Sequence, residues 1–150
     1  MNAFLSIEIQ SGEVFFDTQD RMKADNVAWC VHHTASALAQ RGYNKMIMYI
    51  DNNPAHKTLM RFFLALLPRL PIDIQIKHLP PYSPKLNIVE YLIHLIRQKN
   101  LHHAPHSQDI GTVKQRLSNY LCYKKPFEQE MIYNILDHID VSVRLHNLTT

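Results

Sequence analysis

The chain has 150 residues, of which 46% are hydrophobic and 19% charged, a composition typical of one folded domain with a modest core and not of a disordered chain. Sixteen Lys and Arg against 13 Asp and Glu give a net charge of +3, which permits binding to nucleic acid without indicating it. Two cysteines exclude a disulfide framework, and no apolar run approaches the ~20 residues of a membrane helix, so we expect a cytoplasmic protein with no signal peptide.

The N-terminal part of the chain predicts a β-hairpin followed by a helix. Residues that favour strands fill the runs 3–9 and 13–17, and Gly12 lies in the short connection between them. A periodic apolar pattern comes next, and Asp25 is placed as the N-cap of a helix that ends near Gln40.

The middle of the chain predicts two strands separated by a helix. The apolar run Lys45–Ile50 has the length of a strand, and Asp51 stands at its C-terminal end. A helix is expected to begin at His56, and the alternating run Ile72–Lys77 predicts a second strand with one apolar face. The residues expected to form the buried stripe of the helix are Leu59, Phe62, Phe63, Leu66 and Leu67.

A proline-rich segment, Leu79–Pro84, separates the second strand from the next helix. Its three prolines exclude helix and strand pairing, so a stiff extended lead-in is expected. Asn87 is placed to cap the following helix, with Glu90 in its first turn. Further helices are predicted near 108–122 and 127–139, and the last ten residues are expected to be ragged.

Asp51 and Glu90 are candidate site residues because of where these elements put them. Ligands of open α/β sheets bind beyond the carboxyl ends of strands, and the chain between the two acids is long enough to return to one sheet edge. Carboxylate oxygens are the ligands that Mg²⁺ prefers. The alternative is an ordinary turn aspartate and a helix-start glutamate, which the helix dipole stabilises by ~0.3–1 kcal/mol. Spacing alone favours that alternative.

A longer motif changes this balance. It comprises Asp51-Asn52, then His56, and then Leu-Pro-Pro-Tyr-Ser-Pro-Lys-Leu-Asn-Ile-Val-Glu over residues 79–90. This motif resembles the catalytic domain of mariner-superfamily DDE transposases, in particular their bacterial insertion-sequence branch. The resemblance also covers residues 2–41 and fades after about Asn100.

The resemblance implies a chemistry and a set of site residues. Asp51 and Glu90 would match the family's second and third catalytic acids and would hold two Mg²⁺ (or Mn²⁺) ions for DNA strand cleavage and strand transfer in cut-and-paste transposition. Asn52, His56 and Asn87 would be their active-site neighbours. Contacts to DNA are expected from Tyr82, Lys85, Arg97 and Lys99.

The resemblance also implies a fold, from which this sequence departs. The implied fold is α/β and RNase H-like, a mixed sheet with flanking helices, divided into a partial catalytic domain at 1–100 and a C-terminal helical extension of that domain at 101–150. The family's first catalytic aspartate lies on a central strand that precedes the hairpin, and neither Asp17, Asp20 nor Asp25 takes its place. We therefore expect an N-terminally truncated transposase domain with unpaired strand edges, inactive as an isolated chain and active only in a completed protein.

The sequence also admits three other interpretations. The chain is alternatively a non-catalytic module derived from a transposase, which binds DNA or an intact transposase and inhibits it. Another RNase H-like nuclease is a weaker alternative, because such families need not carry the proline motif. A cluster of His102, His103 and His106 suggests metal binding, but no cysteine accompanies it, so a solvated loop is favoured.

The resemblance implies partners and a location as well. The expected partners are DNA, both transposon ends and target, together with a second copy of the chain or an upstream transposase segment, and no membrane. The expected location is the bacterial cytoplasm, with nucleoid association when the protein is bound to DNA.

Overall fold

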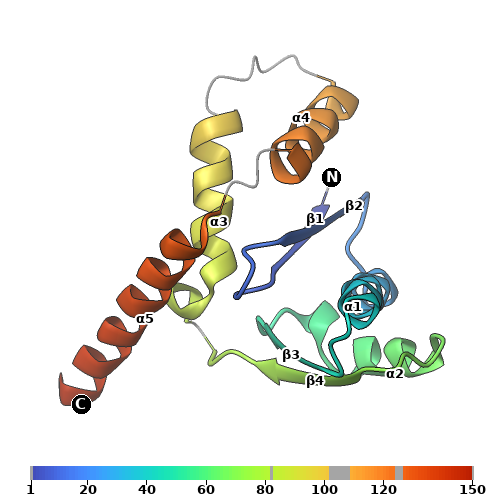
Figure 1. Cartoon of the computed structure of the whole chain (residues 1–150), viewed down its shortest axis with the longest axis horizontal. Helices are drawn as coiled ribbons and strands as arrows, with labels where there is room; N and C mark the ends of the chain where they lie inside the picture. Colours follow the sequence, from blue (N-terminus) through green and yellow to red (C-terminus); the bar gives the residue numbers. More distant parts are fainter. Residues whose placement is uncertain (1, 82, 102–108, 124–126, 150) are drawn as a thin grey trace. The chain divides into compact units, whose positions relative to one another are not determined.

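The computed structural model describes residues 2–81, 83–101, 109–123 and 127–149. Within them the fold is mixed α/β, with five α-helices and two two-stranded sheets (Figure 1). This agrees with the predicted α/β class and is consistent with an RNase H-like fold. The chain divides into two compact units, the first from residues 1–4 and 17–83, the second from residues 5–16 and 84–150.

The predicted hairpin is confirmed. Strands β1 (Asn2–Ile7) and β2 (Val14–Gln19) pair, and the main-chain N–H of Glu8 donates to the carbonyl of Glu13 at 2.8 Å. Gly12 has φ +73° in the connection, a backbone conformation that favours glycine.

Helix α1 (Ala24–Gln40) begins two residues earlier than predicted. Its N-cap is Lys23, whose N–H donates to Asn26 Oδ1 at 3.4 Å, so the prediction that Asp25 caps the helix is wrong. Asp25 instead lies in the first turn, where a carboxylate complements the positive end of the helix dipole. The helix buries a stripe at helical spacing: Val27, Val31, Ala35 and Leu38.

Strands β3 (Lys45–Ile50) and β4 (Asp73–His78) are parallel, in a register that runs from Lys45 opposite Asp73 to Ile50 opposite His78. The residues that follow the two strands, Asp51 and Leu79, therefore lie at the same edge of the sheet. Within the described residues β3 pairs with β4 alone, which leaves its other edge without a partner strand.

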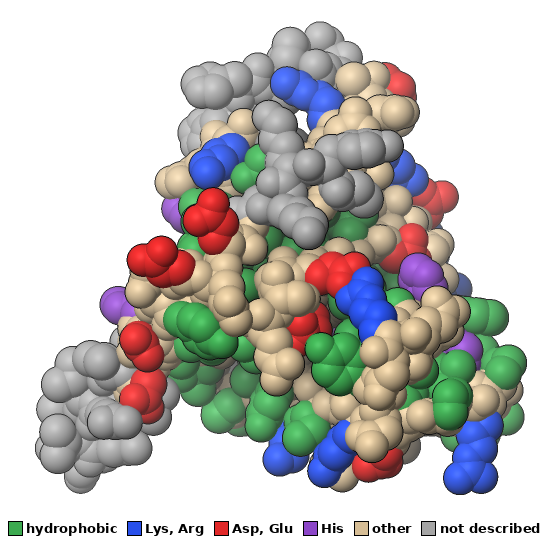
Figure 2. All heavy atoms as spheres, viewed as in Figure 1, with side chains coloured by type: hydrophobic (Ala, Val, Ile, Leu, Met, Phe, Trp, Pro, Cys, Tyr) green, Lys and Arg blue, Asp and Glu red, His purple; other side chains and the backbone are tan. Residues whose placement is uncertain are grey.

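Helix α2 (Thr58–Leu66) corrects the predicted stripe. Met60 is fully buried, whereas Leu59, Phe62 and Leu66 are 58%, 58% and 66% exposed. Hydrophobic side chains accordingly reach the surface over α2 (Figure 2, lower right). A shift of one residue turns a helix face by about 100°. Because this helix is apolar on nearly all sides, its sequence pattern does not determine which face packs.

His56 lies before α2, in the short turn η1 (Pro54–His56), so the prediction that the helix begins at His56 is also wrong. The reason is local: Pro54 fixes its own φ, and η1 and α2 are separate elements with Lys57 between them as the N-cap of α2.

The second unit is mainly helical. The 3-10 turn η2 (Pro84–Leu86) leads into α3 (Ile88–Ile96), which continues as the short π-helix η3 (Arg97–Leu101). Helices α4 (Ile110–Tyr123) and α5 (Gln129–Thr149) follow. Its buried core consists of Leu92, Ile96, Leu117, Leu121, Phe127 and Ile132. The predicted ragged C-terminus is wrong, since α5 continues to Thr149; neither glycine nor proline interrupts that stretch.

Asn87 is the N-cap of α3, as predicted: its Oδ1 accepts the Val89 N–H at 3.1 Å. We expect Asn87→Ala to lower the free energy of unfolding by about 1 kcal/mol, because one N–H of the first turn loses its partner. Urea unfolding followed by circular dichroism measures the change. Asn119→Ala, at an exposed position inside α4, is the matched control and should leave stability unchanged or slightly raised; equal losses in both variants would contradict a capping role.

No helix among the described residues combines the length and the apolar character that crossing a bilayer requires.

Candidate active site at the end of strand β3

Asp51 directly follows β3, and one oxygen of its carboxylate is held by two donors. Oδ1 accepts the Asn53 N–H at 3.0 Å and lies 2.5 Å from Nδ1 of His56. A carboxylate oxygen is an acceptor, so His56 Nδ1 carries the proton. The His56 side chain is 15% exposed and the Asp51 side chain 49% exposed. His56 is thus a largely buried donor that orients a carboxylate still open to solvent.

The turn after β3 is tied to the end of β4 by its main chain and side chains. The Leu79 N–H donates to the Ile50 carbonyl at 2.8 Å, and the Asn52 side-chain amide donates to the Leu79 carbonyl. His78 Nδ1 lies 3.3 Å from the Asp51 carbonyl oxygen. Asn52 therefore contributes to the shape of the turn.

Sequence reasoning missed His78. The only signal for it was a polar residue that follows Ile72, Ile74 and Ile76 at the two-residue spacing of one strand face.

Glu90 lies in the first turn of α3, and this residue is exposed. Its N–H donates to the Asn87 carbonyl at 3.0 Å, so Asn87 shapes the helix start through both its side chain and its main chain. Asp51 belongs to the first unit and Glu90 to the second. The structure brings Asp51 together with Asn52 and His56, and Glu90 together with Asn87, while the convergence of the two acids stays a prediction.

Asp17, an acid of strand β2, accepts local hydrogen bonds. Its Oδ1 accepts the Thr18 N–H at 2.8 Å, and Oδ2 accepts from Gln19 Nε2 at 3.1 Å and from Cys30 Sγ at 3.5 Å. Burial, with the Asp17 charge adding to it, raises the pKa of the Cys30 thiol to about 12. Asp17 is thus engaged in structure, and across the described residues no group of three or more His, Cys, Asp and Glu side chains is arranged to hold a metal ion.

A family model described as DDE superfamily endonuclease matches residues 1–113, which is most of the chain. The chain belongs to this superfamily. No curated protein and no solved structure matches it. The match spans Asp51, Glu90 and the elements that carry them.

Membership in the DDE superfamily confirms the predicted resemblance at superfamily level. It assigns the chain to proteins with transposase-type DNA cleavage, which act on DNA and typically use divalent metal ions. The donor chemistry of the site fits such an ion, because the Asp51 side chain is 49% exposed and a carboxylate oxygen open to solvent is a suitable ligand for Mg²⁺.

The basic residues predicted to contact DNA lie in the second unit of this DDE protein. Lys85 is in η2, and Arg97 and Lys99 are in η3, all three exposed. Exposed cations are compatible with phosphate contacts and equally with a solvated surface. Tyr82 and the cluster His102, His103 and His106 lie outside the described residues.

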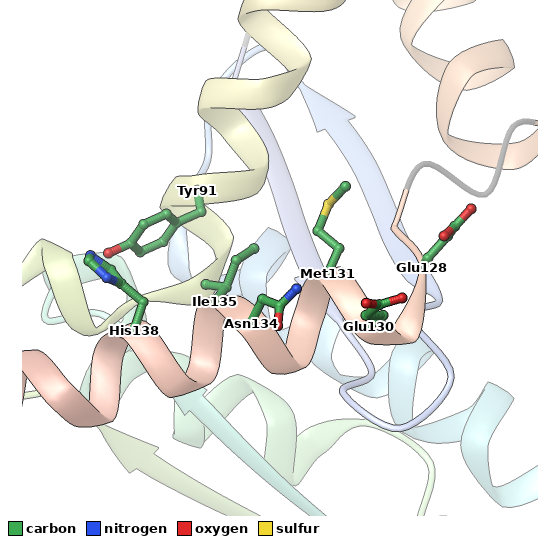
Figure 3. A pocket seen from close by; sticks show the side chains of 7 residues that line it. All are labelled: Tyr91, Glu128, Glu130, Met131, Asn134, Ile135 and His138. Carbon is green, nitrogen blue, oxygen red and sulfur yellow. The ribbon is translucent and has the colours of Figure 1, made fainter.

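The second unit also contains an open pocket of about 450 Å³ between α3 and α5 (Figure 3). Tyr91 and His138 meet edge to face at one end, with ring centroids 6.3 Å apart, and two glutamates lie at the other. Both glutamates stand at the start of α5, where the helix dipole accounts for them. Neither Asp51 nor Glu90 lines this pocket, so it is separate from the candidate active site. Its lining consists of Tyr91, Glu128, Glu130, Met131, Asn134, Ile135 and His138.

Proposed function

We propose that this chain supplies two of the three carboxylates of a DDE transposase active site, Asp51 and Glu90, for metal-dependent DNA strand cleavage and strand transfer in cut-and-paste transposition. The finer assignment is a mariner-superfamily transposase of the bacterial insertion-sequence branch. The observation that carries the proposal is the family match over residues 1–113 together with Asp51 at the carboxyl end of β3.

The third carboxylate, in this proposal, comes from a strand outside residues 1–150. Two observations support it. The described acids form no metal-holding group, and β3 has an edge with no partner strand in the described residues, where another strand would find main-chain donors and acceptors. A strand that paired there in parallel would end beside Asp51, which is where a further metal ligand is needed.

Each residue of the proposed site has a distinct role. Asp51 offers Oδ2 as the ligand, while His56 and the Asn53 N–H keep Oδ1 in place. Glu90 presents a second carboxylate from a helix start that Asn87 caps. When bound by such carboxylates, Mg²⁺ or Mn²⁺ supplies positive charge to activate a water or 3′-hydroxyl nucleophile and to stabilise the leaving oxygen.

The test begins with the DNA upstream of the Met1 codon, read in all three frames for a strand that ends in an aspartate. The chain is then produced with and without that segment and incubated with supercoiled plasmid in Mg²⁺, Mn²⁺ or EDTA. We expect metal-dependent nicking by the completed protein and none by residues 1–150 alone. Equal nicking by both proteins would contradict the need for a third acid.

A non-catalytic role is the second candidate, favoured by the lack of a three-acid group among the described residues. In this role the chain binds DNA, or an intact transposase, without cutting. Gel shifts run on the same reactions separate the two candidates: retained DNA without nicking, in the completed protein as well, would favour the binding module over the enzyme. Retention by phosphate contacts should weaken steeply as salt increases.

A further inference from the structure

His78, the last residue of β4, makes a contact that no part of the proposed chemistry uses. Its ring Nδ1 lies 3.3 Å from the main-chain carbonyl oxygen of Asp51, and its side chain is half-buried. The parallel register places His78 opposite Ile50, one residue before Asp51. A side chain at the end of one strand therefore reaches the first residue beyond the end of the other.

The chemistry of this contact determines which nitrogen of the His78 ring carries a proton. A carbonyl oxygen only accepts hydrogen bonds, so the contact requires a proton on Nδ1 of His78. The same reasoning applies to His56, whose Nδ1 donates to the Asp51 carboxylate. Asp51 is thus held at two points by two histidines, at its side chain by His56 and at its main chain by His78.

We propose that His78 is a positioning residue for Asp51, and that its Nδ1–H···O=C bond fixes the main chain from which the metal-binding carboxylate projects. The metal part of this inference rests on the proposed function. Leu79 and Asn52 add hydrogen bonds across the same junction, but neither reaches Asp51 itself. His78 is the residue of β4 whose side chain holds the Asp51 carbonyl, so its loss leaves that carbonyl and the turn behind it less restrained.

The experiment compares His78→Phe with His78→Asn in the completed protein, in which all three carboxylates of the proposed site are present. Phenylalanine keeps a ring without a donor, whereas the side-chain amide of asparagine places an N–H near the position of Nδ1. Mn²⁺ binding is measured by electron paramagnetic resonance of the free ion. We expect His78→Phe to weaken Mn²⁺ binding about tenfold, at the lower end of the loss typical for groups that orient a ligand, and His78→Asn to restore most of it. His33→Phe, at an exposed histidine of α1, is the matched control and should leave binding unchanged.

A second readout needs no metal. Long-range ¹H–¹⁵N NMR of the wild-type chain should show a proton on Nδ1 of His78, and the amide nitrogen of Asn52 should shift in His78→Phe because the preceding carbonyl loses a donor. The absence of a proton on Nδ1, or an Asn52 resonance that does not move, would overturn the inference. So would an unchanged Mn²⁺ affinity in His78→Phe if Asp51→Asn abolishes binding. If Asp51→Asn leaves Mn²⁺ binding intact, the proposed metal site fails instead, and the NMR result alone decides the role of His78.

Discussion

Asp51→Asn is expected to lower metal-dependent DNA cleavage by the completed protein at least about a thousandfold. Asparagine keeps the size and one oxygen of the side chain but removes the negative charge that a metal ligand supplies. Losing that charge costs several kcal/mol of transition-state stabilisation, and each 1.36 kcal/mol is a factor of ten in rate. Single-turnover nicking of plasmid DNA at saturating Mg²⁺ measures the change.

The matched control for this substitution is Asp25→Asn. Asp25 is an exposed acid of the same unit, and it lies in the first turn of α1. Its removal should leave the cleavage rate within about twofold of wild type. Comparable loss in both variants would mean that lower charge or stability, rather than the site, explains the effect. Undiminished cleavage by Asp51→Asn would remove Asp51 from the mechanism.

Met60→Ala is expected to destabilise the first unit by about 2–5 kcal/mol, because Met60 is fully buried and its truncation leaves a cavity. Leu59→Ala, one residue earlier on α2, should cost no more than about 1 kcal/mol, since 58% of the Leu59 side chain is exposed. Urea unfolding followed by fluorescence of Trp29, the single tryptophan, reports on this unit because α1 packs against α2.

The pair of substitutions distinguishes two faces of α2. The sequence pattern predicts Leu59 inside, and the structure places Met60 there. A larger loss for Leu59→Ala than for Met60→Ala would restore the predicted stripe and contradict the packing in the structure. Circular dichroism of both variants at 0 M urea shows whether each still folds before the unfolding free energies are compared.

Short sequence patterns predict the element correctly where the residues favour one local structure, as at the Asn87 cap and the strand Lys45–Ile50. Asn87 was predicted to cap α3 because a short polar side chain after a proline-rich segment has few other roles, and Lys45–Ile50 was predicted as a strand from its length and apolar character. The placement of Asp51 after a strand and of Glu90 in a first helical turn followed from these elements.

The rest depends on packing that no local pattern contains. The run MIMYI of β3 is apolar throughout, yet Met46 and Met48 are buried while Ile47 and Tyr49 are 44% and 57% exposed. Which face of α2 or β3 is covered is decided by neighbours distant in sequence. His78 is an example within the site: its contact with Asp51 exists only because β3 and β4 pair in one particular register.

That register also determines when the turn at Asp51 can form. Asn52 and Leu79 are 27 residues apart in the chain, with the whole of α2 between them, so their hydrogen bond requires the two parallel strands to be aligned. Contacts of such sequence separation are slow to form and are lost together when the strands part. A destabilising substitution on α2 would therefore lower the fraction of molecules in which the turn at Asp51 is formed, although α2 carries no carboxylate.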